Sequence, residues 1–291
     1  AGVTFRFSRF RAPHNWGAQA IFSAMATRFP QTRGGLGRKR RDMGLIEANW
    51  GLGARVFCGS TIIGSSKRLR DSNYCLNNER AADEEIVIAN RNRLQNLIGA
   101  SHIAWMKQIH GKHVVKVGIS DKAELADTDA CWTRERGIGL AVLTADCLPV
   151  VITSEKRDWL GIAHAGWRGL ASGIIGELIS CYSYSPSELV AWIGPSISKE
   201  KYEVGQEVWS MFDEQHSDHF MRHSSDSRPG KRFLNLVAVA ESQLIEAGVV
   251  KIYPSGLCSY SDARFFSARR VQRSATREFD GRLATVALLK G

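Results

Sequence analysis

The sequence predicts an α+β fold, in a single domain that begins near residue 45. Near-continuous apolar runs at Ile138–Leu143 and Leu148–Thr153 are typical of strands covered on both faces. Other segments repeat apolar residues every three or four positions, which indicates helices. No internal repeat or low-complexity linker divides the chain, and 291 residues with 44% hydrophobic content can bury a large core.

Strands and helices are both expected along this domain. Short apolar runs predict strands at Leu45–Gly59, His102–Gln108, His113–Val117, Ile138–Leu143, Leu148–Thr153, Trp159–Ala163, Leu189–Ile193 and Leu283–Leu289. Helical periodicity predicts helices at Ala81–Ile98, Leu170–Tyr182, Val204–Phe212 and Leu236–Ala247. Gly99 and Gly248 stand where two of these helices should end, and Asn235 stands where the last should begin.

The positive charge of the chain is concentrated in residues 1–43. This segment holds eight arginines and one lysine against one acid, Asp42, which accounts for +8 of the net charge of +10. It has no helical or strand periodicity, so we interpret it as a basic flexible extension, either solvated or a non-native leader with Met43 as the true start. We do not expect a nucleic-acid partner, because the body of the chain is nearly neutral.

Composition also predicts the compartment. No run of about 18 apolar residues is present for a membrane span, and the apolar stretch at residues 20–26 is too short for a secretory signal. We therefore expect a cytoplasmic protein with no membrane partner. The cysteines lack paired spacing, so we expect no disulfide framework; they are Cys58, Cys75, Cys131, Cys147, Cys181 and Cys258.

Two histidines and one cysteine stand where apolar, strand-like runs break. They are His110, Cys147 and His164. Taken singly, each has an ordinary alternative as a core residue. Together they predict a zinc site, because imidazole and thiolate suit zinc and three protein ligands with an open fourth position are typical of catalytic zinc. His113 would point away from His110 in a strand, so we prefer His110, at the break.

Residues around His164 suggest what else the site could hold. Gly166 and Gly169 allow positive φ and close backbone approach. The helix expected just beyond Arg168 would aim backbone N–H groups at an anion such as phosphate, with Arg168 beside it. Asp129 and Asp146 are further catalytic candidates for orienting a ligand or moving a proton; the alternative for each is capping a turn.

Longer motifs then indicate a family. The sequence reads Gln-Ile-His-Gly at 108–111, Thr-Ala-Asp-Cys-Leu-Pro-Val at 144–150 and Ala-His-Ala-Gly-Trp-Arg-Gly at 163–169. Trp-Ile-Gly-Pro at 192–195, Tyr-Glu-Val at 202–204 and Phe-Phe-Ser at 265–267 support them. In this order the motifs resemble the laccase-domain or "polyphenol oxidase" family, the YfiH-like proteins, from about Leu45 to Leu289.

The resemblance implies a fold, a metal and an activity. It implies a single-domain mixed β-sandwich flanked by helices, with residues 44–291 as the catalytic domain and zinc held by His110, Cys147 and His164. It also implies phosphorolysis of adenosine, inosine and methylthioadenosine, and deamination of adenosine. The partners would be a purine nucleoside and phosphate, and the protein a monomer or small homo-oligomer. Zinc deaminases attack C6 of adenine with hydroxide made at the metal.

Two stretches depart from the family pattern. An arginine and an asparagine usual near the substrate mouth are replaced by Ile62 and Cys75, and extra residues lie between Arg270 and Arg282. The changes at Ile62 and Cys75 predict weak binding of nucleoside or phosphate, unless Arg68, Arg70 or another nearby basic residue takes over the lost charge.

Other activities stay open. Some relatives are linked to copper-dependent phenol oxidation, which makes Cu²⁺ the alternative metal. Multicopper centres need many histidines, whereas this chain has eight, with no His-x-His pair and three of them in a polar stretch expected as a surface loop. A Cys-His hydrolase acting on a peptidoglycan precursor would use Cys147 as nucleophile and His164 as base. A third possibility is a non-catalytic binding or interaction protein, and the only feature that supports it is the basic extension at residues 1–43.

Overall fold

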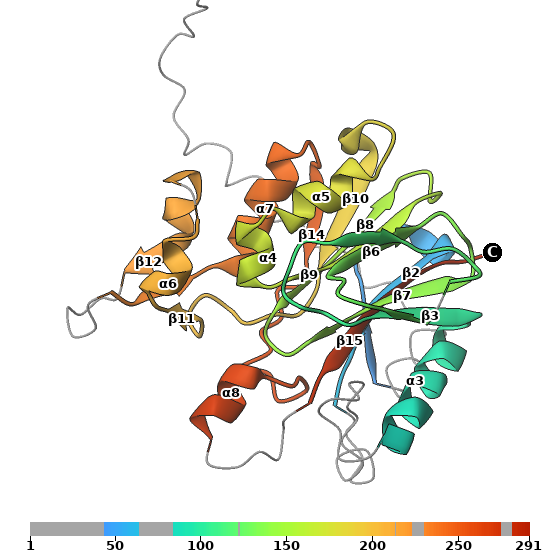
Figure 1. Cartoon of the computed structure of the whole chain (residues 1–291), viewed down its shortest axis with the longest axis horizontal. Coiled ribbons are helices and arrows are strands. Elements are labelled where there is room, and N and C mark those ends of the chain that lie inside the picture. Colours follow the sequence, from blue (N-terminus) through green and yellow to red (C-terminus); the bar gives the residue numbers. More distant parts are fainter. Residues whose placement is uncertain (1–43, 64–83, 122, 213, 223–229, 275–280) are drawn as a thin grey trace, which may run out of the picture. The chain divides into compact units, whose positions relative to one another are not determined.

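Two six-stranded sheets lie face to face in the computed structural model, which describes residues 44–63, 84–121, 123–212, 214–222, 230–274 and 281–291. Figure 1 shows both sheets with helices around them. The basic extension at residues 1–43 lies outside the described residues, and so do Arg68, Arg70 and Cys75.

The first sheet has the strand order β1-β2-β15-β7-β3-β5. Its strands are β1 Leu45–Glu47, β2 Val56–Thr61, β15 Leu283–Leu289, β7 Ile138–Thr144, β3 His102–Met106 and β5 Glu124–Leu125. Pairing is antiparallel from β1 to β7 and parallel from β7 to β5. The sheet is therefore mixed.

The second sheet has the order β14-β10-β8-β9-β6-β4. Its strands are β14 Lys251–Pro254, β10 Leu189–Ile193, β8 Leu148–Ser154, β9 Leu160–Ala165, β6 Ala130–Thr133 and β4 Val114–Lys116. The edge strands β14 and β4 run parallel to their neighbours β10 and β6, and the other neighbouring strands pair antiparallel. A small third sheet contains β11 Glu203–Val204, β13 Arg232–Leu234 and β12 Phe220–Arg222.

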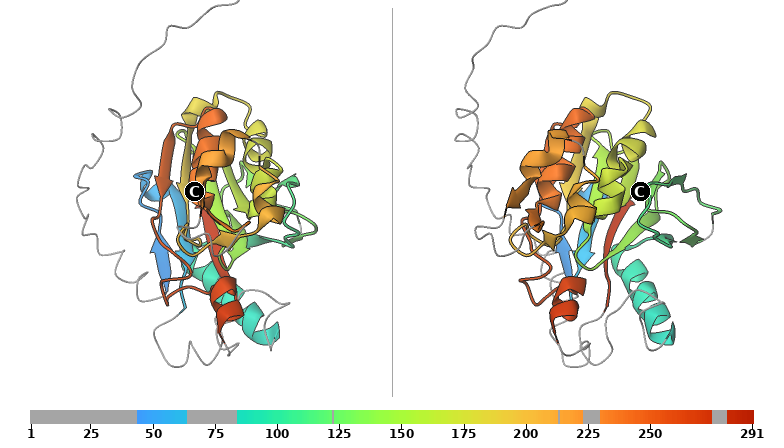
Figure 2. Two further views of the ribbon diagram at one scale, coloured as in Figure 1. Left: turned by 90° about the vertical axis from the view of Figure 1, so that its left-hand side faces the viewer. Right: turned by 60° about the vertical axis from the view of Figure 1, so that its left-hand side comes forward.

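Helices cover the outer faces of both large sheets. The helices are α3 Glu84–Ile98, α4 Trp167–Ala171, α5 Ile174–Ser180, α6 Gln206–Trp209, α7 Leu236–Glu246 and α8 Ala268–Arg273, with short 3-10 turns η1 Gly53–Arg55, η2 Pro186–Glu188 and η3 Glu214–His219. Leu94 of α3 packs on the first sheet, while Leu178 of α5 and Val239 of α7 pack on the second. Figure 2 shows α3, in teal, well apart from the yellow and orange helices.

The core between the sheets explains the continuous apolar runs. Val142 of β7 packs with Val151 of β8 and Ile162 of β9 inside the sandwich, and Leu143 packs outward under α3. Every residue of β7 and β8 is buried because both faces of each strand are covered. The α+β prediction and the mixed β-sandwich flanked by helices are both confirmed.

Local sequence signals correctly predicted where several strands and helices begin and end. The strands expected at Leu189–Ile193 and Leu283–Leu289 have those bounds. Asn235 caps α7, since its side chain accepts a hydrogen bond from the N–H of Ala238 at 3.1 Å. Gly248 follows that helix with a φ of 92°.

Several expected elements differ from the structure. The strand expected at Leu45–Gly59 is two antiparallel strands, β1 and β2, with η1 between them. The helix expected at Leu170–Tyr182 is two helices, α4 and α5, because Gly173 adopts a left-handed conformation (φ 83°) between them. The helix expected at Val204–Phe212 is only α6, since Val204 pairs with β13. His216, in the stretch expected as a surface loop, is buried and packs edge-on against Phe212.

The cysteines that the structure describes are free thiols. None of the described helices is both long and apolar enough to span a bilayer.

Candidate metal centre

The ligand atoms of His110, Cys147 and His164 all lie within 4.8 Å of one another. Two of the three residues lie where the chain passes from the first sheet to the second. His110 follows β3 on the way to β4, and Cys147 lies between β7 and β8. The structure thus brings together the three residues that the sequence singled out.

His164 differs from the expectation in one respect. It lies within β9 rather than at a strand break, and it pairs with Pro149 of β8. Its side chain is almost fully buried, whereas His110 is exposed and Cys147 is partly buried. The cluster therefore opens to solvent on the His110 side.

Asp129 orients two of the three candidate ligands. Its buried carboxylate accepts hydrogen bonds from the backbone N–H groups of Ile109, His110 and Gly111 at 3.1, 3.0 and 2.8 Å. The same carboxylate lies 2.8 Å from Nδ1 of His164. Burial acts to raise the pKa of Asp129, but the hydrogen bonds from His164 and Gly111 outweigh it and lower that pKa. The ionised carboxylate thus favours a proton on Nδ1 of His164 and leaves Nε2 for a ligand.

The surroundings of Cys147 favour its thiolate form. Burial raises the pKa of its thiol, but the charge of His164 and hydrogen bonds with His110 and His164 outweigh burial and lower the pKa to about 6. The charge of the Cys147 thiolate and the contact with Asp129 in turn hold the pKa of His164 above its ordinary value, against the effect of burial. A thiolate is the form that binds metals and attacks electrophiles.

Gly166 leaves room for all three side chains. A Cβ atom there would lie 3.2 Å from Sγ of Cys147, 3.4 Å from Cδ2 of His110 and 3.7 Å from Cε1 of His164. At Gly169 a Cβ would lie 3.2 Å from the carbonyl oxygen of Gly111. Gly166 has a φ of −67°, and Gly169 lies within helix α4. Both glycines are thus explained by close approach and not by positive φ.

Asp146 is placed to anchor α8. Its carboxylate accepts hydrogen bonds from the hydroxyls of Ser259 (2.6 Å) and Ser267 (3.0 Å) and from the N–H of Arg269 (2.7 Å). Ser267 itself caps the helix. The backbone of Asp146 has a φ of 95°, which is uncommon for a residue other than glycine. These contacts match the capping alternative for Asp146.

Arg168 is exposed in the five-residue helix α4, and its guanidinium lies 4.3 Å from the ring centre of Trp167. It does not contribute to the lining of the pocket beside His110, Cys147 and His164.

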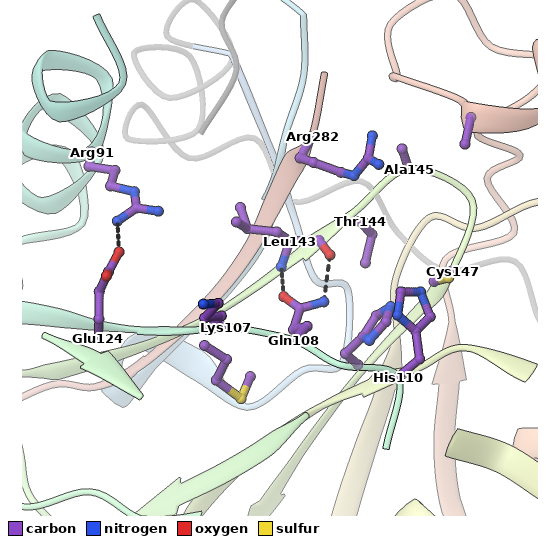
Figure 3. A pocket seen from close by; sticks show the side chains of 13 residues that line it. Arg91, Lys107, Gln108, His110, Glu124, Leu143, Thr144, Ala145, Cys147 and Arg282 are labelled. Atoms are coloured by element: carbon purple, nitrogen blue, oxygen red, sulfur yellow. Dashed lines mark hydrogen bonds and ion pairs between the residues drawn. The ribbon is translucent and has the colours of Figure 1, made fainter. Parts of the chain in front are cut away.

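A pocket of about 440 Å³ adjoins the cluster (Figure 3). Its lining residues are Arg91, Met106, Lys107, Gln108, His110, Glu124, Leu143, Thr144, Ala145, Cys147, His164, Ala268 and Arg282. The amide of Gln108 bridges to Leu143, donating to its carbonyl at 2.9 Å and accepting from its N–H at 2.7 Å. This bridge joins β7 to the loop after β3.

The charged members of this lining were missed by sequence reasoning. Arg91, Lys107, Glu124 and Arg282 come from four separate segments, so no local spacing signals their convergence. Gln108 did carry a signal, because it opens the Gln-Ile-His-Gly motif. Ile62, one of the departures from the family pattern, is partly buried against a cluster that includes Ala145, Phe265 and Phe266.

Comparison with known proteins defines the family. A family model described as multi-copper polyphenol oxidoreductase laccase matches residues 62–290. The chain belongs to this laccase family. The resemblance inferred from the motifs is thereby confirmed.

Several proteins similar to this chain carry another enzyme name. A protein of Xylella fastidiosa named purine nucleoside phosphorylase is 40% identical over 68% of this chain and 76% of its own length. A Pseudomonas aeruginosa protein named purine nucleoside phosphorylase is 31% identical over 84% of this chain and 98% of its own. The crystal structure of Bacillus licheniformis YfiH has a TM-score of 0.74 at 26% identity, covering 85% of this chain and 97% of the other.

Proposed function

We propose that this protein is a metal-dependent purine nucleoside phosphorylase in which His110, Cys147 and His164 hold zinc. The observation that carries the proposal is the convergence of the three ligand atoms beside a 440 Å³ pocket, a volume in the range of small-molecule sites. The names of the relatives suggest the substrates, a purine nucleoside and phosphate.

The residues fit a zinc ion. Ligand atoms about 2.0–2.3 Å from a tetrahedral zinc lie roughly 3.3–3.8 Å apart, so donor atoms within 4.8 Å need only small side-chain rotations to close around it. Asp129 holds the His164 ring, and Gly166 leaves space between the three side chains. A zinc ion bound there would act as a Lewis acid and activate water at neutral pH.

Copper is the alternative metal, because histidine and cysteine also bind it. Multicopper oxidation needs several copper centres, and among the described residues one cluster offers three such ligands. This ligand count favours zinc chemistry over phenol oxidation.

Phosphorolysis requires the nucleoside and phosphate in one pocket. An oxygen of phosphate forms a bond to C1′ of the ribose as the bond from C1′ to the purine nitrogen breaks. The purine leaves with the bonding electrons and takes up the proton that the phosphate carried, which yields ribose 1-phosphate and the free base. The protein groups would hold the two reactants in line, and this positioning lowers the barrier to the reaction.

We propose adenosine, inosine and methylthioadenosine as phosphorolysis substrates, because they share the purine and the ribose C1′. We also propose deamination of adenosine at the same centre. Water adds to C6 and ammonia leaves, which gives inosine. Asp129 would act as a positioning residue in both reactions, through His110 and His164.

A second candidate is a cysteine hydrolase acting on a peptidoglycan precursor. Its specific support is the series Cys147, His164 and Asp129, which provides a thiolate, a base beside it and an orienting carboxylate 2.8 Å from that base. His110 beside Cys147 is the residue that this alternative leaves unexplained, whereas a metal centre uses it as the third ligand.

One experiment separates these functions. Purified full-length protein is analysed for zinc and copper, and then assayed with adenosine, inosine and methylthioadenosine, each with and without phosphate. We expect about one zinc per chain. Free base and ribose 1-phosphate (5-methylthioribose 1-phosphate from methylthioadenosine) should form only when phosphate is present, and inosine should form from adenosine without it. Metal-free protein that retains full activity on a peptidoglycan fragment would instead establish the hydrolase.

A further inference from the structure

We propose that the side-chain amide of Gln108 is a positioning group that fixes the distance between His110 and Cys147, two of the three candidate metal ligands. The inference rests on the metal centre of the proposed function and deepens it. Gln108 comes two residues before His110, and its partner Leu143 comes four residues before Cys147. Both hydrogen bonds of the amide, to the carbonyl of Leu143 at 2.9 Å and from its N–H at 2.7 Å, are drawn in Figure 3.

These two hydrogen bonds take the place of backbone pairing between β3 and β7. The parallel pairing of the two strands ends at Trp105 and Ala141. Leu143 lies two residues further along β7 and still belongs to that strand. A primary amide offers an N–H donor and a C=O acceptor, as a peptide group does, so the Gln108 side chain satisfies Leu143 beyond the end of β3. The main chain after β3 can therefore turn toward the second sheet while the end of β7 stays fixed.

Leu143 provides a buried base for the bridge. It pairs with Ala284 of β15 on the other side of β7, and its side chain packs under α3. Leu143 is only 8% exposed, so loss of the amide would deprive a buried N–H and a buried carbonyl of their hydrogen bonds, which is costly. The bridge thus ties the loop that carries His110 to a central strand of the first sheet.

The loop that carries His110 is therefore held from both sheets. Asp129, directly before β6 of the second sheet, accepts a hydrogen bond from the N–H of His110 and contacts the ring of His164. Gln108 makes the connection to the first sheet and, through the end of β7, to the segment between β7 and β8 that carries Cys147. Asp129 couples His110 to His164, and Gln108 couples His110 to Cys147. Together the two side chains set the spacing of the three ligand atoms, which lie within 4.8 Å of one another.

The first measurement needs no metal. Gln108→Met keeps the length of the side chain and removes both hydrogen bonds. Gln108→Asn is the milder variant, because its amide is one methylene too short to make them. Amide hydrogen exchange is followed in metal-free, full-length protein. We expect exchange about tenfold faster at Leu143 and in the loop at residues 109–111, because local opening no longer has to break the bridge.

The second measurement reports on the metal ligands. Zinc affinity is determined by competition with a chelator, and Co²⁺ is substituted so that absorption from the thiolate–metal bond reports the geometry at Cys147. We expect Gln108→Met to bind zinc about 10- to 100-fold more weakly, the range usual for partners behind metal ligands, and to change the cobalt spectrum. With saturating zinc, kcat should fall while the adenosine KM stays unchanged, since Gln108 acts through the ligands and not on the nucleoside.

Two control variants separate positioning from a general loss of stability. The buried hydroxyl of Thr133 also bridges two backbone groups, donating to the carbonyl of Val117 at 2.7 Å and accepting from the N–H of Glu135 at 3.0 Å. Thr133 ends β6 and does not line the pocket, so Thr133→Val should lower the free energy of unfolding and leave the zinc affinity and cobalt spectrum unchanged. Gln95→Met removes an amide bond from α3 to the carbonyl of Ser101 (2.9 Å) and should change neither metal measurement.

The outcomes separate this inference from the proposed function. Weaker zinc binding and a changed cobalt spectrum in a protein that does not cleave nucleosides would retain the positioning role and reject the phosphorylase. Phosphorolysis by both Gln108 variants, with wild-type zinc affinity and cobalt spectrum, would overturn the positioning role and retain the phosphorylase. A raised adenosine KM with a wild-type cobalt spectrum would make Gln108 a substrate contact instead. Equal losses of zinc affinity in Thr133→Val and Gln108→Met would also overturn the role, because stability alone would then explain them.

Discussion

Oδ1 of Asp129 lies 2.8 Å from Nδ1 of His164, and the same carboxylate holds the backbone of the loop that carries His110. One buried side chain thus sets the ring orientation of one candidate ligand and the loop position of another. Such partners behind metal ligands commonly change metal affinity about 10- to 100-fold.

Asp129→Asn should lower zinc affinity by about that factor. The NH₂ group of the asparagine would face backbone N–H groups that now donate to the carboxylate, so the loop that carries His110 would lose hydrogen bonds. Zinc affinity is measured by competition with a chelator. Asp127→Asn is the matched control, because Asp127 is an exposed neighbour with positive φ, a conformation that asparagine tolerates. Equal zinc affinity in the two variants would contradict the positioning role.

Cys147→Ala and His164→Ala should each lose the bound zinc while the fold persists. Zinc at this centre needs all three protein contacts. Elemental analysis gives the metal content, and circular dichroism checks the fold. Cys181→Ala, a partly exposed cysteine at the end of α5, should keep about one zinc per chain. Stoichiometric zinc retained in both ligand variants would rule out this metal site.

Gly166→Ala should weaken zinc binding by crowding the three ligands. The new methyl group would lie 3.2 Å from Sγ of Cys147, so the thiolate or the helix start must shift. Gly176→Ala is the control, because a Cβ there meets nothing within 4 Å and the residue lies inside α5. That control should keep its zinc and gain about 0.5–1 kcal/mol of stability from helix propensity. Unchanged zinc affinity in Gly166→Ala would show that the centre tolerates the methyl group.

Asp146→Asn should reduce stability without loss of zinc. An asparagine offers one acceptor oxygen where the carboxylate now accepts from Ser259, Ser267 and Arg269, so the free energy of unfolding should fall by about 1–3 kcal/mol. Ser267→Ala should reproduce part of this loss. Urea unfolding provides the measurement. A variant with wild-type stability and full zinc content but no turnover would instead make Asp146 catalytic.

Strands β7, β8, β10 and β15 and helix α7 were predictable because their signals are local. The apolar runs of β7 and β8 follow directly from burial on both faces, and Asn235 with Gly248 marks the ends of α7 through backbone hydrogen bonding and positive φ. The break between α4 and α5 was missed, because apolar spacing continues across Gly173 while the backbone there turns left-handed.

The sequence by itself determined the three candidate ligands, because each lies in a motif whose residue types suit metal binding. Only the tertiary structure decided what surrounds them. Asp129 reaches His164 because β6 pairs with β9, and Lys107 and Arg282 line one pocket because the end of β3 and the start of β15 lie on either side of the end of β7. Such neighbours follow from strand order, which depends on how whole sheets bury their faces. No short stretch of sequence encodes that order, so the carboxylate behind the metal centre and the cations of the pocket emerge only when the sandwich is complete.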